Sequence, residues 1–375
     1  PYSNANRDDL GAPKTVVFGG KERTRVSSQS WKRVIRLQVE HVLEQDTVRT
    51  RRVVAGVAER LIGRGWSPGD AEAAGIQVAV SAGGGISLKE EKGESGEKFL
   101  ITNVLLLLPE SGIDDLATLA EAHRDEILSA AAKTKKRTDK PKPVLPSDAI
   151  ADILGRRSGT INLFGRMLAE LPGANVDGAI QVAHAFTTHG TSVEYDFFSA
   201  VDDVERKLGL PGSGHINTAM FSAGTFYRYA NVGVDQLLKN LDQDADLART
   251  LVTEFLKAFI DTVPSGKQNS TAAATAPDLV HIVVRADRPA SMSSAFEAPL
   301  TGEGGYVAGS VARLADHAAS IAKLRGTDNI LWSGFAADDL AIKTVDDAAA
   351  AFGTRHEAFA SLVSAAVAAT YGELS

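Results

Sequence analysis

Near the start of the chain, a short apolar run and a run that alternates charged and smaller residues precede a change to a helical period. Residues 15–18 and 21–26 are typical of two strands, and the two glycines between them favour a turn. Apolar side chains then recur at helical intervals, at Trp31, Val34, Ile35, Val42 and Leu43. Ser27 and Ser28 stand where a helix N-cap is expected. The pattern predicts a strand pair followed by a helix.

The next hundred residues predict more helices and a buried strand. We expect helices over 47–80, broken by the turn sequence at 65–69, and a loop or hairpin tip over 81–98. A continuous apolar run predicts a buried strand at 99–109, and a helix follows at 113–133. Because of the prolines that begin at Pro141, no helix continues past Lys140.

The second half of the chain mixes both kinds of element. Residues 160–167 are strand-like, and 176–186 are helix-like. The stretch 189–221 has two turn clusters and no sustained period, which predicts a protruding hairpin. A helix at 247–263 leads through a loop to a strand at 279–285. The alanine-rich remainder, 290–375, is expected to pack on a sheet or to meet protein partners.

The composition limits the class of protein. The 375 residues exceed one average domain, and 44% hydrophobic content is enough to bury a sizeable core. The chain has no cysteine, so disulfides, zinc–thiolate sites and thiol nucleophiles are excluded. The longest apolar run, at 104–108, is far too short to span a membrane. With no signal pattern at its start, the sequence predicts a cytoplasmic protein without a membrane partner.

Positive charge gathers at the start of an otherwise acidic chain. The first 36 residues hold eight basic and three acidic side chains, about +5, whereas the whole chain carries −7. The basic residues are Arg7, Lys14, Lys21, Arg23, Arg25, Lys32, Arg33 and Arg36. A basic block of this kind in a chain that repels phosphate overall predicts a polyanion site.

The predicted helix start gives that site a possible geometry. Ser27, Ser28 and Gln29 offer donors beside the unpaired N–H groups of the helix N-terminus. The cations Lys32, Arg33 and Arg36 surround that end, and Lys32 and Arg36 share a face because they are four residues apart. One phosphate or a short run of nucleic-acid backbone would fit there. A solvated charged face on an amphipathic helix is an equal alternative on composition alone.

Other candidate sites are weaker. A second basic cluster, comprising Lys133, Lys135, Lys136, Arg137 and Lys140, fits a solvated linker, a tether between subdomains or a second nucleic-acid surface. His184 and His189 are five apart, which matches no common metal-ligand pair. No serine-hydrolase, P-loop or zinc-protease motif occurs in the sequence. We expect no metal, no cofactor and no enzymatic activity.

Several long segments closely resemble the CasC family, the repeated backbone subunit of the type I-E CRISPR surveillance complex Cascade. The resemblance begins with NRDDLGAPKTVVFGGKERTRVSSQSWKRVIR at 6–36. It continues through NLFGRM (162–167), DGAIQVAHAFTTH (177–189), FSAVDDV (198–204), FSAGTFYRYANV (221–232), VPSGKQNS (263–270) and RPASMSSAFE (288–297). The segments are long, in the family's order and spread over most of the chain.

The resemblance implies an α+β fold shaped like a hand. It implies an RRM-like (ferredoxin-like) palm at 1–45, 156–186 and 223–375, helical fingers at 46–155, and a thumb hairpin at 187–222. The family has a strand just before the segment that corresponds to residues 3–9, and this sequence begins at Pro1. That strand is expected to be either absent from the protein or supplied by residues that precede Pro1.

The resemblance also implies a function and a set of contacts. It implies copies assembled head-to-tail along a guide CRISPR RNA, which is presented for pairing with target DNA beside other Cascade subunits. Implied RNA contacts, beyond Arg7, Lys14 and the helix start, are Arg166 near the backbone, Met167 as a wedge at a kinked nucleotide, and Lys267 and Gln268 in a helix-to-strand loop. The five cations of the second cluster are implied contacts for DNA. The alternative is an RNA-cleaving subunit of a type III-like complex, with Asp8 or Asp9 as its acid.

Overall fold

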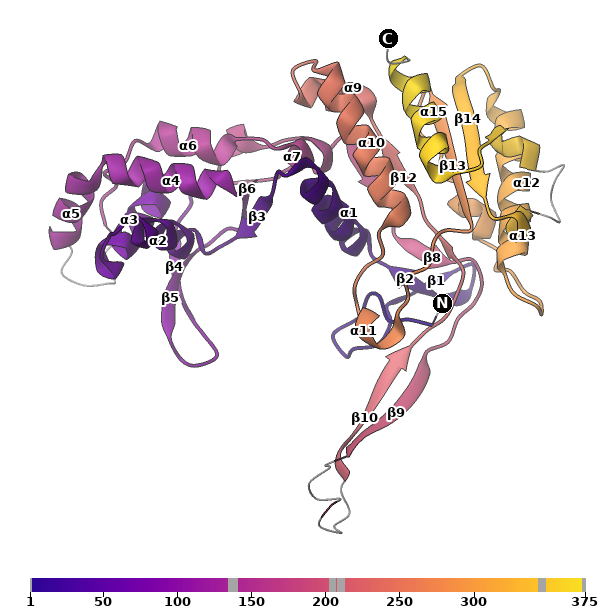
Figure 1. Ribbon diagram of the computed structural model, residues 1–375, viewed down its shortest axis with the longest axis horizontal. Coiled ribbons are helices and arrows are strands. Elements are labelled where there is room, and N and C mark those ends of the chain that lie inside the picture. The colour runs from indigo at the N-terminus through magenta and orange to yellow at the C-terminus, as the bar shows by residue number, and fades with distance from the viewer. Residues whose placement is uncertain (1, 134–140, 202–206, 208–212, 343–348, 373–375) are drawn as a thin grey trace. The chain divides into compact units, whose positions relative to one another are not determined.

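The computed structural model describes residues 2–133, 141–201, 207, 213–342 and 349–372. The chain divides into two compact units. Unit 1 comprises residues 1–38, 181–232 and 252–375, and unit 2 comprises 39–180 and 233–251. Both combine helices with small sheets, so the α+β class is confirmed (Figure 1).

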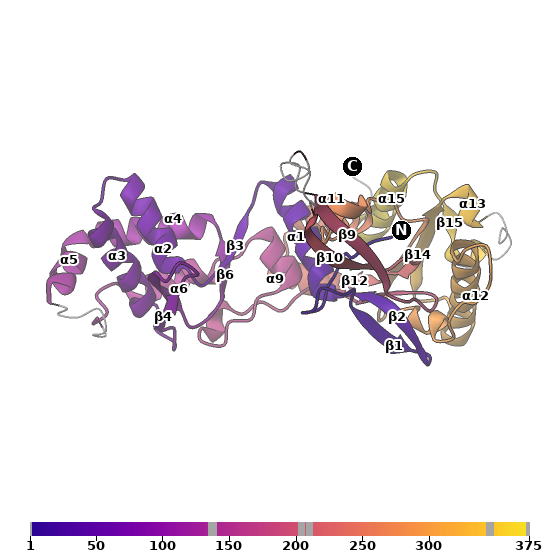
Figure 2. The ribbon, with the colours of Figure 1, turned by 90° about the horizontal axis from the view of Figure 1, so that it is seen from below.

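The first sheet of unit 1 is built on the predicted strand pair. Strands β1 (Thr15–Phe18) and β2 (Lys21–Val26) have the predicted bounds and pair antiparallel (Figure 2). The sheet continues from β2 to β8 (Ala185–Thr187) and then to β11 (Phe226–Tyr227). Arg25 lies opposite Phe186, which in turn lies opposite Tyr227.

The helix after this strand pair is α1 (Ser28–Leu43), as the apolar spacing predicts. The hydroxyl of Ser27 accepts a hydrogen bond from the Ser30 N–H at 3.3 Å, so Ser27 is the cap. Trp31 and Ile35 of the predicted apolar stripe are buried in the core, whereas Val42 at its end is exposed.

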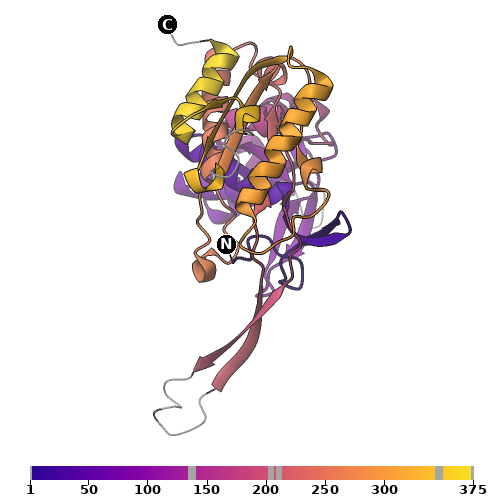
Figure 3. The same cartoon turned by 90° about the vertical axis from the view of Figure 1, so that its right-hand side faces the viewer.

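A hairpin formed by β9 (Glu194–Val201) and β10 (Ser213–Phe221) lies within the region predicted for one, and it joins no other sheet among the described residues (Figure 3). Glu194 pairs with Phe221 at its base. Its β9 strand exposes Tyr195, Phe197 and Phe198. Exposed aromatic side chains of this size on one strand indicate a contact surface.

The second sheet of unit 1 comprises β13 (Leu279–Arg285), β14 (Ile330–Ala337) and β15 (Thr354–Arg355), with β13 at its predicted position. Helix α12 (Val307–Arg325) lies on one side of it and α15 (Phe359–Tyr371) on the other (Figure 1). Phe352 is fully buried, with ring centroids 5.7 Å from Phe335 and 4.8 Å from His281. Burial lowers the pKa of His281 to about 4, so this ring packs uncharged at neutral pH.

Unit 2 is mainly helical. Its apolar core gathers side chains from five helices: α2 (Val53–Gly63), α3 (Pro68–Ser81), α4 (Ser111–Ala122), α5 (Arg124–Lys133) and α6 (Ser147–Gly155). Two antiparallel pairs complete it: β3 (Thr47–Thr50) with β6 (Leu106–Pro109), and β4 (Leu88–Lys92) with β5 (Lys98–Thr102). The hairpin predicted within 81–98 is therefore present.

Three predictions in this unit are wrong in detail. Residues 47–50 form a strand instead of the start of a helix, and the helix predicted at 113–133 is interrupted at His123. The strand predicted at 99–109 divides because Asn103 leaves the ladder. Its side-chain oxygen accepts from the Ser87 N–H at 2.8 Å, and its amide donates to the Gly85 carbonyl at 3.1 Å.

Two further predictions are reversed. The segment predicted as a strand at 160–167 instead begins with the helix α7 (Gly159–Phe164), because Ser158 caps it by accepting from the Ile161 N–H at 3.2 Å. The segment predicted as a helix at 176–186 instead contains β7 (Ile180–Val182) and most of β8. A short apolar run fits the helical period and the strand period equally well, so it does not distinguish a helix from a strand.

The remaining elements are short, apart from one long helix at the predicted 247–263. They are η1 (Pro172–Ala174), β12 (Ala230–Val232), α9 (Val234–Asn240), α10 (Ala245–Asp261), α11 (Gln268–Thr271), η2 (Ser293–Phe296), α13 (Asp339–Ile342) and η3 (Ala350–Phe352). In the part of the chain that the structure describes, no helix has the length and apolar content needed to cross a membrane.

The buried position of Phe352 predicts a large loss of stability on truncation. Phe352→Ala should lower the free energy of unfolding by about 3–5 kcal/mol, since it leaves a cavity beside Phe335 and His281. Leu340→Ala, at a side chain 77% exposed, should change it by no more than about 0.5 kcal/mol. Urea unfolding followed by circular dichroism measures both. Equal effects would contradict the assigned core.

Candidate nucleic-acid interface

Two asparagines anchor the segment that precedes β1. The Asn4 side chain is buried, and its amide donates to the carbonyls of Gly11 at 2.9 Å and Met220 at 2.7 Å. The Asn6 side-chain oxygen accepts from the Ser27 N–H at 2.9 Å. The N-terminal loop is thereby fixed both to β10 and to the start of α1.

Asp8 shapes the tip of this loop. Its carboxylate accepts from the N–H groups of Leu10 and Ala12, each at 2.9 Å. This is a local turn, of the kind that aspartate side chains commonly form. Arg7, next to it, is exposed and pairs through its backbone with Pro13. The loop therefore holds the Arg7 guanidinium outward on a fixed backbone.

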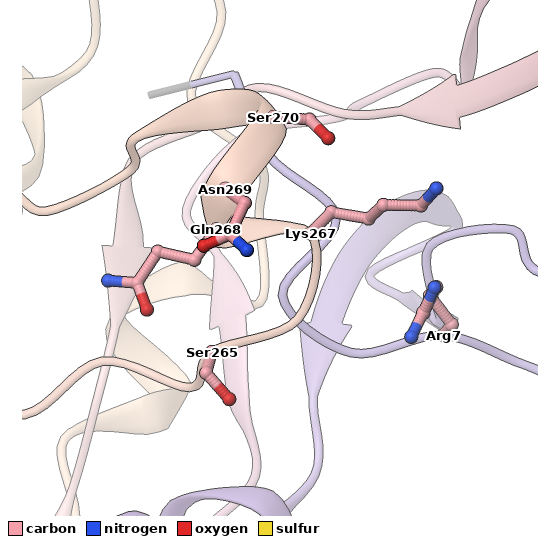
Figure 4. Close-up of a pocket in the computed structure, with 6 residues that line it drawn as sticks. All are labelled: Arg7, Ser265, Lys267, Gln268, Asn269 and Ser270. Atoms are coloured by element: carbon pink, nitrogen blue, oxygen red, sulfur yellow. The ribbon is translucent and has the colours of Figure 1, made fainter.

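A glycine brings a distant loop against this segment. A side chain at Gly266 would place its Cβ 2.5 Å from the Ala5 carbonyl oxygen, so only glycine permits the approach. The result is a hollow of about 480 Å³ within unit 1. It is lined by Arg7, Ser265, Lys267, Gln268, Asn269 and Ser270 (Figure 4). Arg7, Lys267 and Gln268, predicted separately from the sequence, are thus brought together.

The start of α1 offers donors and cations. Gln29 and Arg33 are exposed, Lys32 and Arg36 are half-buried, and the first turn holds no acid. Lys32 and Arg33 form no ion pair with a carboxylate among the residues that the structure describes. The hydroxyl of Ser27 is occupied in capping, whereas Ser28 is half-buried and donates to the Gln29 side chain at 3.4 Å. Lys32 and Arg33 can therefore meet phosphate without first breaking an ion pair.

A buried cation supports this helix from behind. The Arg228 guanidinium lies 3.6 Å from the Trp31 ring centroid and 4.4 Å from that of Phe259, and it donates to the Phe259 carbonyl at 2.6 Å. Burial lowers the pKa of Arg228 to about 10, so it stays charged at neutral pH and keeps its cation–π contacts. Trp31 therefore fixes the orientation of the basic face of α1.

The two arginines of β2 lie two residues apart on one face of the strand, but they differ in burial. Arg23 is completely buried and donates to the carbonyls of Thr187 at 2.8 Å and Phe296 at 3.1 Å. Burial lowers its pKa. Arg25 is half-buried and lies 2.9 Å from the Nδ1 atom of His184. Arg25 belongs to the basic block that the sequence predicts, but neither Arg25 nor His184 was among the predicted RNA contacts.

Arg166 and Met167, adjacent in unit 2, differ completely in exposure. The Arg166 guanidinium is buried and donates to four carbonyls, those of Ala174, Leu107, Arg156 and Gly155, at 2.7–3.2 Å. Burial disfavours the predicted contact of Arg166 with RNA backbone and gives it a structural role. Met167 is 88% exposed, as a wedge requires.

The second basic cluster falls mostly outside the described residues. Lys133 ends α5 and is exposed. Lys135, Lys136, Arg137 and Lys140 lie outside the described residues, so the DNA contacts predicted for them stay predictions. Among the described residues, no group of three or more histidine, aspartate and glutamate side chains is arranged to hold a metal.

Comparisons with known proteins give consistent matches. The family profile described as CT1975-like protein matches residues 1–364. A chain of a solved CRISPR RNA-guided surveillance complex, described as pre-nicking, is 51% identical, with 99% of this chain and 97% of that chain covered and a TM-score of 0.90. A chain of another CRISPR RNA-guided surveillance complex is 44% identical, with 98% and 96% covered and a TM-score of 0.79. The comparison with curated proteins gives no match.

The contrast between Arg166 and Met167 predicts opposite effects on stability. Arg166→Met should lower the free energy of unfolding by at least about 3 kcal/mol, because buried carbonyls lose their donors. Met167→Ala, its matched neighbour, should change it by no more than about 0.5 kcal/mol. Urea titration of both variants checks this. An unchanged Arg166→Met would show that the guanidinium is not a structural tie.

Proposed function

We propose a function for this chain, which belongs to the family of CT1975-like proteins. It is similar over almost its whole length to subunits of CRISPR RNA-guided surveillance complexes. We propose that it binds guide CRISPR RNA as a backbone subunit. The predicted resemblance to the CasC family is confirmed by these matches. The specific proposal is a type I-E Cascade subunit that presents the guide for pairing with target DNA in antiviral defence.

One observation carries the RNA-binding proposal. Arg7 and Lys267, far apart in the sequence, line the same hollow together with the amides of Gln268 and Asn269. Cations and amide donors on fixed loops suit a phosphodiester backbone and need no particular base. A guide-binding subunit must accept any sequence, and recognition then belongs to base pairing.

The same logic extends along the basic track, which we define as Arg7, Lys14 and the α1 residues Ser27, Ser28, Gln29, Lys32, Arg33 and Arg36. We propose that this track follows the RNA backbone within an RRM-like palm. Met167 is proposed to wedge at an unstacked nucleotide, because a flexible apolar side chain can fill such a gap. Arg166 is proposed to fix the backbone beside Met167 through its hydrogen bonds to carbonyl groups.

Growth along one RNA strand requires head-to-tail contact between copies, since a closed dimer could not continue. We propose that the β9–β10 hairpin makes this contact as a thumb, and its exposed Tyr195 and Phe197 support the proposal. Residues 46–155 would be the fingers, with Lys133 and the rest of the second basic cluster toward target DNA. Other Cascade subunits would join this assembly.

We propose a non-catalytic role at this subunit. The geometry of Asp8 supports it, because this carboxylate is engaged by two backbone N–H groups of its own loop. Asp9 follows it in the same tight turn. No observation on the described residues favours the RNA-cleaving alternative, so we do not propose it.

The hollow predicts a measurable salt dependence. Arg7→Gln combined with Lys267→Gln should weaken binding of single-stranded RNA at least about tenfold, because charge-assisted hydrogen bonds to phosphate are lost. The slope of log affinity against log salt should become shallower by about one. Fluorescence anisotropy with two RNAs of unrelated sequence measures both quantities.

The control removes the same charge elsewhere. Lys239→Gln combined with Lys323→Gln replaces two exposed lysines outside the basic track and should leave affinity and slope nearly unchanged. If the control weakened binding as much as the hollow variant did, net charge alone would account for the effect. If neither variant changed the slope, the hollow would not be a phosphate site.

A further inference from the structure

Two cations, Lys14 and Arg25, lie with His184 on one face of the first sheet of unit 1. Lys14 directly precedes β1, and its carbonyl accepts from the Arg25 N–H at 2.7 Å, so the two residues are cross-strand neighbours. Arg25 lies opposite Phe186 in β8, and His184 precedes Phe186 by two residues. Because side chains alternate along strands, all four side chains share one face.

The contact between Arg25 and His184 fixes the tautomer of the histidine. Nη1 of Arg25 lies 2.9 Å from Nδ1 of His184. A guanidinium can only donate, so Nδ1 accepts, and the proton of the neutral ring is on Nε2. His184 is exposed, and Arg25 and Lys14 are half-buried. An anion arriving there would meet three donors.

No carboxylate neutralises this group among the described residues. Neither Lys14 nor Arg25 forms an ion pair there, and the pKa of His184 is lowered by partial burial and then by the charges of Arg25 and Lys14. An anion beside the ring would offset both charges. A protonated ring can no longer accept from Arg25, so protonation also frees the guanidinium to turn to the anion.

We propose that Lys14, Arg25 and His184 form a phosphodiester-binding site that takes up a proton at His184 when RNA occupies it. This rests on the proposed function and adds Arg25 and His184 to the basic track. RNA is favoured over a free oxyanion because the site continues the N-terminal loop, where the Lys14 N–H donates to the Asn6 carbonyl at 2.9 Å. Phe186, half-buried on the same face and 5.2 Å from Phe18 between ring centroids, adds apolar surface suited to a nucleotide.

The direction of the pH effect follows from linkage. The pKa of His184 lies below its ordinary value in the free protein. A bound phosphate would offset the charges of Arg25 and Lys14 and so raise it. Binding therefore takes up a proton between the two values, and affinity rises as the pH falls through that window. The gain cannot exceed about tenfold per pH unit for one group.

The test uses the full chain and a short oligouridylate with a 5′-hydroxyl end, because neither uracil nor a phosphodiester titrates in this range. Affinity should rise about three- to tenfold from about pH 7.5 to about pH 5.5 at constant ionic strength. His184→Gln, which keeps a neutral hydrogen-bonding side chain, should bind at pH 7.5 but lose that gain. His317→Gln, at a half-buried histidine that contacts Ser294 in the same unit, should retain it.

NMR titration of His184 in the unchanged protein gives an independent readout. A rise in its pKa with oligouridylate, at concentrations where sulfate has no effect, supports the proposal. A rise with sulfate and none with RNA would overturn it, since the site would then hold free anions. An equal pH gain in His184→Gln would also overturn it and leave RNA binding intact. Absence of RNA binding by the wild type at every pH would overturn the proposed function itself.

Discussion

The hydrogen bonds of two side chains, Asn4 and Asn6, organise everything in unit 1 that we assign to RNA. Asn4 ties the N-terminal loop to β10, and Asn6 ties it to the cap of α1. Gly266 then allows the loop that carries Lys267 to pack on the same segment. Without these contacts, Arg7 would be a charge on a mobile tail, and it could not hold RNA in register with the start of α1.

Charge in this molecule is sorted by burial. On one face of β2, Arg23 is buried and donates to carbonyl groups, whereas Arg25, two residues later, is half-buried beside His184. Arg166 is likewise buried and donates to backbone carbonyls of separate segments, whereas Met167 beside it is exposed. Counting basic residues therefore overestimates the binding surface.

The sequence predicted those elements whose local signals agree with their surroundings. Strand alternation at 15–18 and 21–26, followed by the cap and apolar stripe of α1, was sufficient for correct bounds. The sequence pattern failed at 159–164 and 180–187. A short apolar segment can form a helix or a strand, and its caps and partner strands decide which one forms. The Ser158 cap decides the first case, and pairing with β2 decides part of the second.

The candidate site was predictable in composition but not in geometry. Charge and resemblance pointed to Arg7 and Lys267, yet their meeting depends on the packing of Gly266 against Ala5, which no local pattern encodes. The burial of Arg166 was equally hidden, because four carbonyl partners from separate segments define it. Long-range backbone contacts of this kind carry no periodic signal.

The central claim is that the basic track and the hollow beside it hold the guide RNA. Photo-cross-linking of RNA containing 4-thiouridine to the assembled protein, followed by mass spectrometry of the cross-linked peptides, tests it most directly. The account predicts cross-links in the peptides that span residues 7–36 and 265–270. Cross-links confined to other parts of the chain, with these two segments left unmodified, would contradict it.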